Sequence, residues 1–151
     1  MYQADLDTYG QRCDPRTEKL TMRTIGWLDI AVPYVTGPTP VAFHRRLLEH
    51  CVHGVLRLMC GVHHCQFCNN EPTRTTLWYG NRKVPCDTGE IWVSGGDVIY
   101  VAPAMVYHYV TEHGYCPPDE FIDAVMQGPL PGTAEYCALI THWGMRVHSI
   151  I

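Results

Sequence analysis

The sequence is organised around the stretch HCQFC, residues 64–68. Two cysteines separated by two residues, here Cys65 and Cys68, can point both thiolates at one tetrahedral ion, because this spacing fits a tight knuckle turn. Two further ligands follow about forty residues later, at His108 and His113. The pattern C-x2-C-x39-H-x4-H keeps the histidine pair within the spacing typical of paired zinc ligands. The sequence therefore predicts a domain stapled by Zn²⁺.

The choice of the fourth ligand stays open at the level of sequence. Residues five apart on an ideal helix differ by about 140° in direction, so His108 and His113 share one ion only if the helix end unwinds. Gly114 makes such unwinding plausible. His63 competes with His113 for this place, because His63 and Cys65 can form a chelate across one intervening residue.

The number of protein ligands decides whether such a site is structural or catalytic. Four protein ligands close the site, and the metal then has a structural role. If one histidine is not a ligand, a water occupies the fourth position and is acidified toward neutrality. His63 and Glu112 are the catalytic candidates in that case, since Glu112 shares a helix face with His108 and can act as general base.

Composition places the chain among globular proteins. It has 151 residues, 46% of them hydrophobic and 17% charged, which suits a single domain with a core of its own. The net charge of −4 argues against a nucleic-acid partner, because no basic stripe exists to release counterions. The pairs Arg45-Arg46 and Arg82-Lys83 are interpreted as solvated surface.

The N-terminus carries no secretory pattern, and the longest apolar run, residues 98–110, is too short to cross a membrane. We therefore expect a cytoplasmic protein, in which the eight cysteines are metal ligands and buried thiols rather than disulfides. Residues 1–22 have charge and no periodicity, which predicts a loosely ordered leader. Residues 23–151 are then one zinc-stapled α+β domain.

Periodicity and turn residues predict an α+β fold with an antiparallel β-meander, two or three helices and a treble-clef-like zinc site. A strand or extended segment is expected at 25–32, and the run 136–141 is strand-like, although a helix also fits there. The other predicted strands and helices are strands 55–60, 75–79, 89–93 and 98–101, and helices 40–52, 104–113 and from 117 to Gly128.

Motifs typical of nucleotide-binding proteins, zinc proteases and serine hydrolases are missing from the sequence. It contains no phosphate-binding glycine loop, no H-E-x-x-H and no G-x-S-x-G. Aromatic residues are numerous around the predicted site, and most are expected in the core. They leave open a stacking pocket for a small planar ligand. These residues are Trp78, Tyr79, Trp92, Tyr100, Tyr107, Tyr109 and Tyr115.

The chain resembles a group of uncharacterised bacterial proteins that share several short blocks. These blocks are Gly-Trp-Leu-Asp at 26–29, G-x-H-x-C-x-F-C at 61–68, E-I-x-V at 90–93, Y-x-A-P at 100–103 and H-Y-V-x-x-H-x-Y-x-P-P-x-x-F at 108–121. The likeness covers about residues 25–126. It implies a five-member site in which His63 joins the two cysteines and the two histidines, and it implies no particular activity.

Three functional hypotheses follow. The first is a small intracellular zinc-binding protein with a structural Cys2His2-type site and a binding role. The second is a zinc-dependent hydrolase or lyase with an open metal position near His63 and Glu112. The third and weaker one is an immunity or accessory protein that binds another protein.

Overall fold

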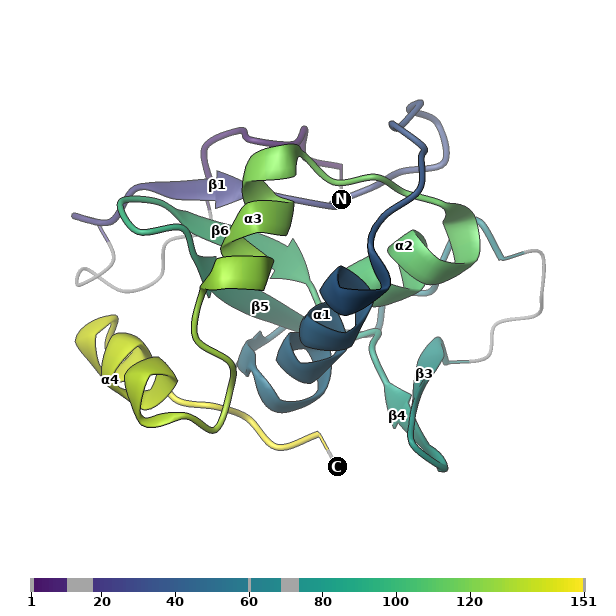
Figure 1. The fold of residues 1–151 in the computed structure, drawn as a ribbon. Helices are drawn as coiled ribbons and strands as arrows, with labels where there is room; N and C mark the ends of the chain where they lie inside the picture. Colours follow the sequence, from purple (N-terminus) through teal and green to yellow (C-terminus); the bar gives the residue numbers. More distant parts are fainter. Residues whose placement is uncertain (1, 11–17, 60, 69–73, 151) are drawn as a thin grey trace.

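The computed structural model describes residues 2–10, 18–59, 61–68 and 74–150. Within these ranges the chain forms four helices and six strands (Figure 1). None of these helices is long and apolar enough to cross a membrane. In chain order the elements are β1 Met22–Thr24, α1 Val41–His53, β2 Val55–Leu58, β3 Thr76–Tyr79, β4 Arg82–Pro85, β5 Gly89–Ser94, β6 Ile99–Pro103, α2 Val106–His113, α3 Asp119–Gln127 and α4 Ala134–His142.

A four-stranded sheet with the order β1-β6-β5-β2 forms the centre of the fold. The β5–β6 and β2–β5 pairs are antiparallel, whereas β1 pairs with β6 in parallel. Side chains alternate between two cores, as the period of a strand requires. Ile91 and Val93 of β5 enter one core, and Trp92 between them enters the other. The sheet is therefore buried on both faces.

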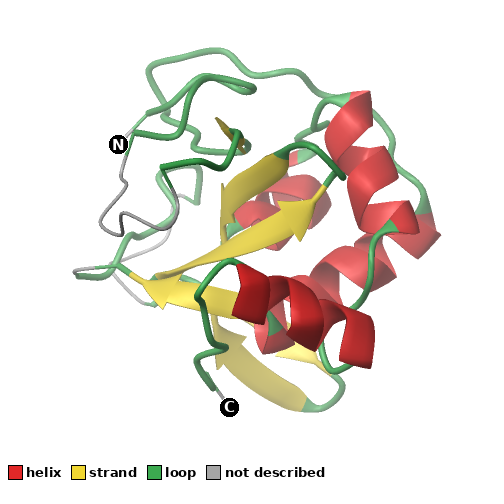
Figure 2. Cartoon of the chain, turned by 90° about the vertical axis from the view of Figure 1, so that its left-hand side faces the viewer, coloured by secondary structure: helices red, strands yellow, loops and turns green. Residues whose placement is uncertain are grey.

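The helices divide between these two faces. Helices α1, α2 and α3 contribute to the larger core, where Phe43 of α1 packs edge to face against Phe121 of α3. Helix α4 contributes to the smaller core, where Trp143 at its C-terminal end lies 6.0 Å from Trp92, measured between ring centroids. Figure 2 shows most of the helices on one side of the strands and long loops on the other.

Residues 2–10 pack against the rest of the chain, unlike the loosely ordered leader expected from the sequence. Described residues 2–10 run beside residues 23–27, with isolated bridges Gln3–Trp27 and Thr8–Arg23. The Tyr9 side chain is buried, and its hydroxyl donates to the carboxylate of Glu90 at 2.8 Å. The sequence does not reveal this packing, because a single buried tyrosine among polar residues has no periodicity. Residues 11–17, including Cys13, lie outside the described part.

The α+β class is confirmed. The C-terminal ends of α1 and α2 lie at the predicted residues. Helix α1 ends at Gly54, and α2 ends at Gly114, which adopts the left-handed conformation with φ 65°. The number of helices differs from the predicted two or three. The run at 136–141 lies in α4, where the Thr133 hydroxyl caps the helix by accepting from the backbone amide of Tyr136.

The strands between the knuckle and α2 also differ in pairing from a simple meander. Strand β3 pairs with β4 in a separate hairpin, and β5 and β6 form a second hairpin within the central sheet. The sequence prediction missed β4, because Arg82 and Lys83 were interpreted as solvated surface. In Figure 1 the β3–β4 hairpin stands apart from the sheet, on the side of α1 and α2.

Candidate metal centre

The cysteine knuckle lies in the segment between β2 and β3, and hydrogen bonds hold it on both sides. The backbone amide of Cys65 donates to the Thr75 hydroxyl at 3.1 Å. The Gln66 side-chain oxygen accepts from the amide of Ile30 at 3.0 Å. Phe67 packs edge to face against Tyr34, with ring centroids 5.2 Å apart. Contacts with the rest of the protein therefore hold the knuckle in place without a metal ion.

Helix α2 supplies the two histidines. His108 lies in the middle of the helix and His113 is its last residue, directly before left-handed Gly114. The amide of Tyr115 donates to the carbonyl of Tyr109, which tightens the helix end. The Tyr34 hydroxyl donates to the carbonyl of His113 at 3.0 Å. The sequence predicted that the helix must unwind at this end if His108 and His113 are to share one ion.

Four side-chain atoms converge between the knuckle and α2. Cys65 Sγ lies 3.3 Å from His113 Nε2, and Cys68 Sγ lies 3.3 Å from His108 Nε2 and 3.4 Å from His113 Nε2. The two Nε2 atoms are 3.1 Å apart, and all four ligand atoms lie within 4.8 Å of one another. Ideal tetrahedral zinc with ordinary bond lengths would give N–N and S–N separations of about 3.3 and 3.6 Å. The donor atoms therefore fit a metal ion.

Hydrogen bonding alone does not account for this convergence. Nε2 of His113 lies within 3.4 Å of two sulfurs and of a second imidazole nitrogen. A neutral imidazole has one N–H proton, so Nε2 can donate toward one of these three atoms at most. Four electron-pair donors facing one another repel unless a cation lies between them. The geometry suits a metal ion at their common centre.

The electrostatic environment favours the ligand form of the histidines. Burial lowers the pKa of His108, with His113 as a second cause, and burial also lowers the pKa of His113. Both imidazoles are therefore neutral near pH 7 and have a free lone pair. Burial raises the pKa of the Cys65 thiol to about 11, so this thiol ionises only when a cation stabilises the thiolate.

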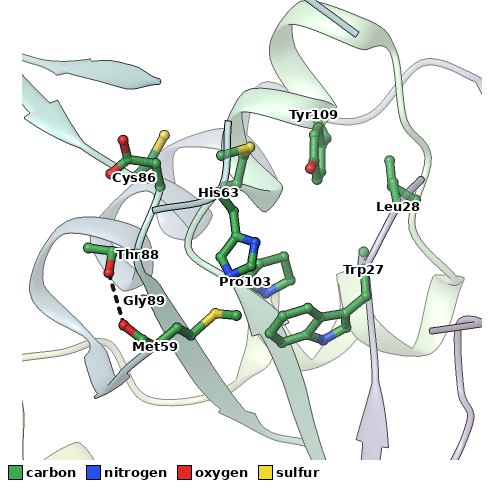
Figure 3. Close-up of a pocket in the computed structure, with 12 residues that line it drawn as sticks. Trp27, Leu28, Met59, His63, Cys86, Thr88, Gly89, Pro103 and Tyr109 are labelled. Atoms are coloured by element: carbon green, nitrogen blue, oxygen red, sulfur yellow. Dashed lines mark hydrogen bonds between the residues drawn. The ribbon is translucent and has the colours of Figure 1, made fainter. Parts of the chain in front are cut away.

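The remaining two predicted site residues lie outside the cluster. His63 is exposed, and its imidazole lines a neighbouring pocket, beside Met59, Pro103 and Trp27 in Figure 3. Glu112 is exposed on α2. In the described residues the cluster has four members, so the five-member site that the family resemblance implied is not assembled. His113, not His63, lies at the fourth corner.

The pocket around His63 has a volume of about 50 Å³ and a mainly apolar and aromatic wall. Tyr109, the residue after His108 on α2, forms part of this wall. Sequence reasoning assigned Trp27 and Met59 no role, because their partners lie far away along the chain. The pocket is lined by Gly26, Trp27, Leu28, Met59, His63, Cys86, Asp87, Thr88, Gly89, Pro103, Met105 and Tyr109.

The other predicted cysteines and aromatics are mostly core residues. Cys51 and Cys86 are buried free thiols and Cys116 is half-buried. Cys137 is exposed on α4, so the prediction of a buried thiol is wrong at this position. Cys60 lies outside the described part. Trp92, Tyr100 and Tyr115 are buried, as sequence reasoning expected for most of the aromatics. Tyr79 and Tyr107 are half-buried, and Trp78 is exposed over 59% of its surface.

The fold and the cluster define a small α+β domain with a Cys2His2-type candidate metal centre. The family model for a domain of unknown function, DUF7919, matches residues 1–126, and the chain belongs to this family. The match contains the knuckle and α2, whereas α4 lies beyond it. Comparison with curated proteins finds no match to the chain, and comparison with solved structures finds none either.

Proposed function

We propose that this chain is a small intracellular zinc-binding protein whose zinc is structural and whose role is to bind another molecule. The observation that carries the proposal is the convergence of Cys65, Cys68, His108 and His113 within 4.8 Å. These residues come from a loop and from a helix forty residues further along the chain. An ion held by all four would join the two segments.

Zinc is the metal that this donor set favours. Two thiolates and two imidazoles in a tetrahedral arrangement are typical of structural zinc sites. Magnesium and calcium prefer oxygen ligands, and none of the four donors is an oxygen. The six cysteines in the described part of the chain are all free thiols, which suits a reducing compartment.

A structural role is favoured over catalysis because four protein ligands leave no position for water. The alternative, a hydrolase or lyase, needs an open metal position with His63 or Glu112 beside it. Neither side chain belongs to the cluster of four. His63 instead faces the adjacent pocket.

Cobalt substitution tests this proposal. Co²⁺ replaces Zn²⁺ in tetrahedral sites and reports its ligands by visible absorption. We expect an intense tetrahedral spectrum with thiolate charge-transfer bands that is unchanged between pH 6.5 and 8.5 and by added azide. His63→Ala is the matched control and should give the same spectrum. A spectrum that titrates near neutral pH or shifts with azide would show an open position and would refute a closed site.

A further inference from the structure

A groove runs between strand β3 and helix α2, next to the candidate metal centre. Its volume is about 380 Å³, far larger than that of the pocket around His63. Three consecutive strand residues line it, so the groove follows the edge of β3 rather than one of its faces. The lining residues are Thr76, Leu77 and Trp78 from β3, and Tyr107, His108, Thr111 and Glu112 from α2.

The hairpin register shows which backbone groups face this groove. Tyr79 pairs with Arg82 across a two-residue turn, and Cys86 donates its amide to the Thr75 carbonyl. Because hydrogen-bonded and non-bonded pairs alternate in antiparallel strands, Thr75, Leu77 and Tyr79 use their backbone groups toward β4. Thr76 and Trp78 then point their amides and carbonyls to the opposite edge, which is the groove side.

This edge of β3 has no strand partner within the described residues, where the only strand paired with β3 is β4. Thr76 is exposed, and Trp78 is 59% exposed. Within the part of the chain that the structure describes, no strand pairs with the amides and carbonyls on this edge. Such a row beside a helix is the surface to which an extended peptide adds as a further strand. Small molecules and membranes do not match such a row of alternating donors and acceptors.

We propose that the groove binds an extended segment of a partner protein, which pairs with the free edge of β3 and lies against α2. Thr76 and Trp78 would each exchange backbone hydrogen bonds with this segment. Tyr107 and the exposed Trp78 ring form the walls that contact its side chains. The proposal rests on the proposed binding function and names its site and the kind of partner.

Charge indicates which side chains the segment carries. Among the described residues that line the groove, Glu112 is the one acidic residue, and His108 is the one basic residue. The Trp78 ring already has a cation of the chain itself beside it, since Lys83 Nζ lies 5.2 Å from its centre, so a basic side chain of the segment fits best beside Glu112 instead. A segment with an arginine or lysine near Glu112 is therefore the best match.

An ion in the candidate metal centre would influence the width of this groove. His108 belongs both to the cluster and to the groove wall. On the strand side, the amide of Cys65 donates to the hydroxyl of Thr75, one residue before β3. An ion that joined Cys65 to His108 would thus fix α2 relative to β3.

The experiment is a selection of phage-displayed 12-residue peptides on the zinc-loaded protein, followed by calorimetry of the best synthetic peptide. Thr76→Pro removes the outward amide of Thr76, which the hairpin does not use, and places a ring in the path of an added strand. Thr76→Val keeps that amide. We expect Thr76→Pro to weaken binding at least tenfold and Thr76→Val to change it less than twofold.

Hydrogen exchange of the wild-type complex and peptide binding by a Glu112 variant test the same proposal independently. In the wild-type complex, the amides of Thr76 and Trp78 should become protected from hydrogen exchange, a result that does not depend on the folding of any variant. Glu112→Gln should weaken binding of the selected basic peptides about threefold to tenfold. Unchanged exchange at both amides would overturn the proposal.

Other outcomes would also overturn it. These are a selection that yields no peptide with Kd below about 100 μM, or equal binding by Thr76→Pro and Thr76→Val. A concentration-dependent dimer that Thr76→Pro abolishes would show that a second copy occupies the edge instead. Peptide binding that survives zinc removal would refute the role of the metal in shaping the groove, but it would not refute peptide binding to the groove. The proposal of a structural zinc site and the proposal of a peptide-binding groove can therefore fail separately.

Discussion

A buried histidine far from the metal centre gives a quantitative prediction about acid stability. His50 of α1 is 2% exposed, and within the described part of the chain neither of its ring nitrogens has a hydrogen-bond partner. Tyr136 of α4 packs against it, with ring centroids 6.0 Å apart. Burial, with Arg46 as a second cause, lowers the pKa of His50 to about 4. The imidazole is therefore neutral in the folded protein.

The sign and size of the effect follow from linkage. The unfolded chain takes up a proton at His50 near pH 6.5, whereas the folded chain does so only near pH 4. The unfolded state therefore binds more protons between these pH values, and stability falls as pH falls through this window. Full protonation corresponds to a loss of about 3 kcal/mol, of which about 2 kcal/mol appears between pH 7.5 and 5.

Urea unfolding of wild type and His50→Leu at pH 7.5 and pH 5 measures this difference. Protonation of the metal ligands affects both proteins equally, so the comparison isolates His50. We expect the stability advantage of the leucine variant to grow by about 2 kcal/mol at the lower pH. The leucine variant should also be no less stable at pH 7.5, because two unpaired buried nitrogens are removed. An advantage that is the same at both pH values would refute a neutral, unpartnered His50.

Three further predictions concern the metal centre and the N-terminal segment. Cys68→Ala should abolish stoichiometric zinc binding and lower the free energy of unfolding by at least about 3 kcal/mol, whereas exposed Cys137→Ala should change neither in metal analysis and urea unfolding. His63→Ala should retain one zinc per chain by mass spectrometry, and loss of zinc would place this residue among the ligands. Tyr9→Phe should lower stability by about 1–3 kcal/mol, since it removes the hydroxyl that donates to buried Glu90. A change below about 0.5 kcal/mol would contradict the packing of residues 2–10.

Helix ends were predictable because the residues found there have strong preferences for particular backbone conformations. Gly54 and Gly114 end α1 and α2 where the sequence indicated. The left-handed conformation of Gly114, with φ 65°, is one that glycine adopts without steric penalty. Such signals act within a few residues, so a single sequence is sufficient to find them.

Elements that depend on distant partners were predicted less well. The apolar run at 136–141 fits a strand or a helix, and its position against Trp92 and Val101 is known only from the folded chain. Strand β4 looks like polar surface, because Arg82 and Lys83 are exposed and only Val84 is buried. Burial of Tyr9 against Glu90 joins residues 81 positions apart, which no local pattern encodes.

In the candidate metal centre, too, the local patterns were predictable and the long-range contacts were not. The spacing of the cysteines and of the helix histidines was sufficient to name the four residues that converge. It was not sufficient to separate His113 from His63, because that choice depends on how α2 ends and on where residues 61–64 run. The groove beside β3 was not foreseen, since it depends on the pairing of β3 with β4.

We propose that Cys65, Cys68, His108 and His113 together hold one zinc ion. X-ray absorption at the zinc edge measures its ligands directly in the purified protein. We predict two sulfurs at about 2.3 Å and two imidazole nitrogens at about 2.0–2.1 Å. We also predict that Cys68→Ala removes this signal. A first shell that contains one sulfur or none, or an oxygen in place of an imidazole, would contradict the account.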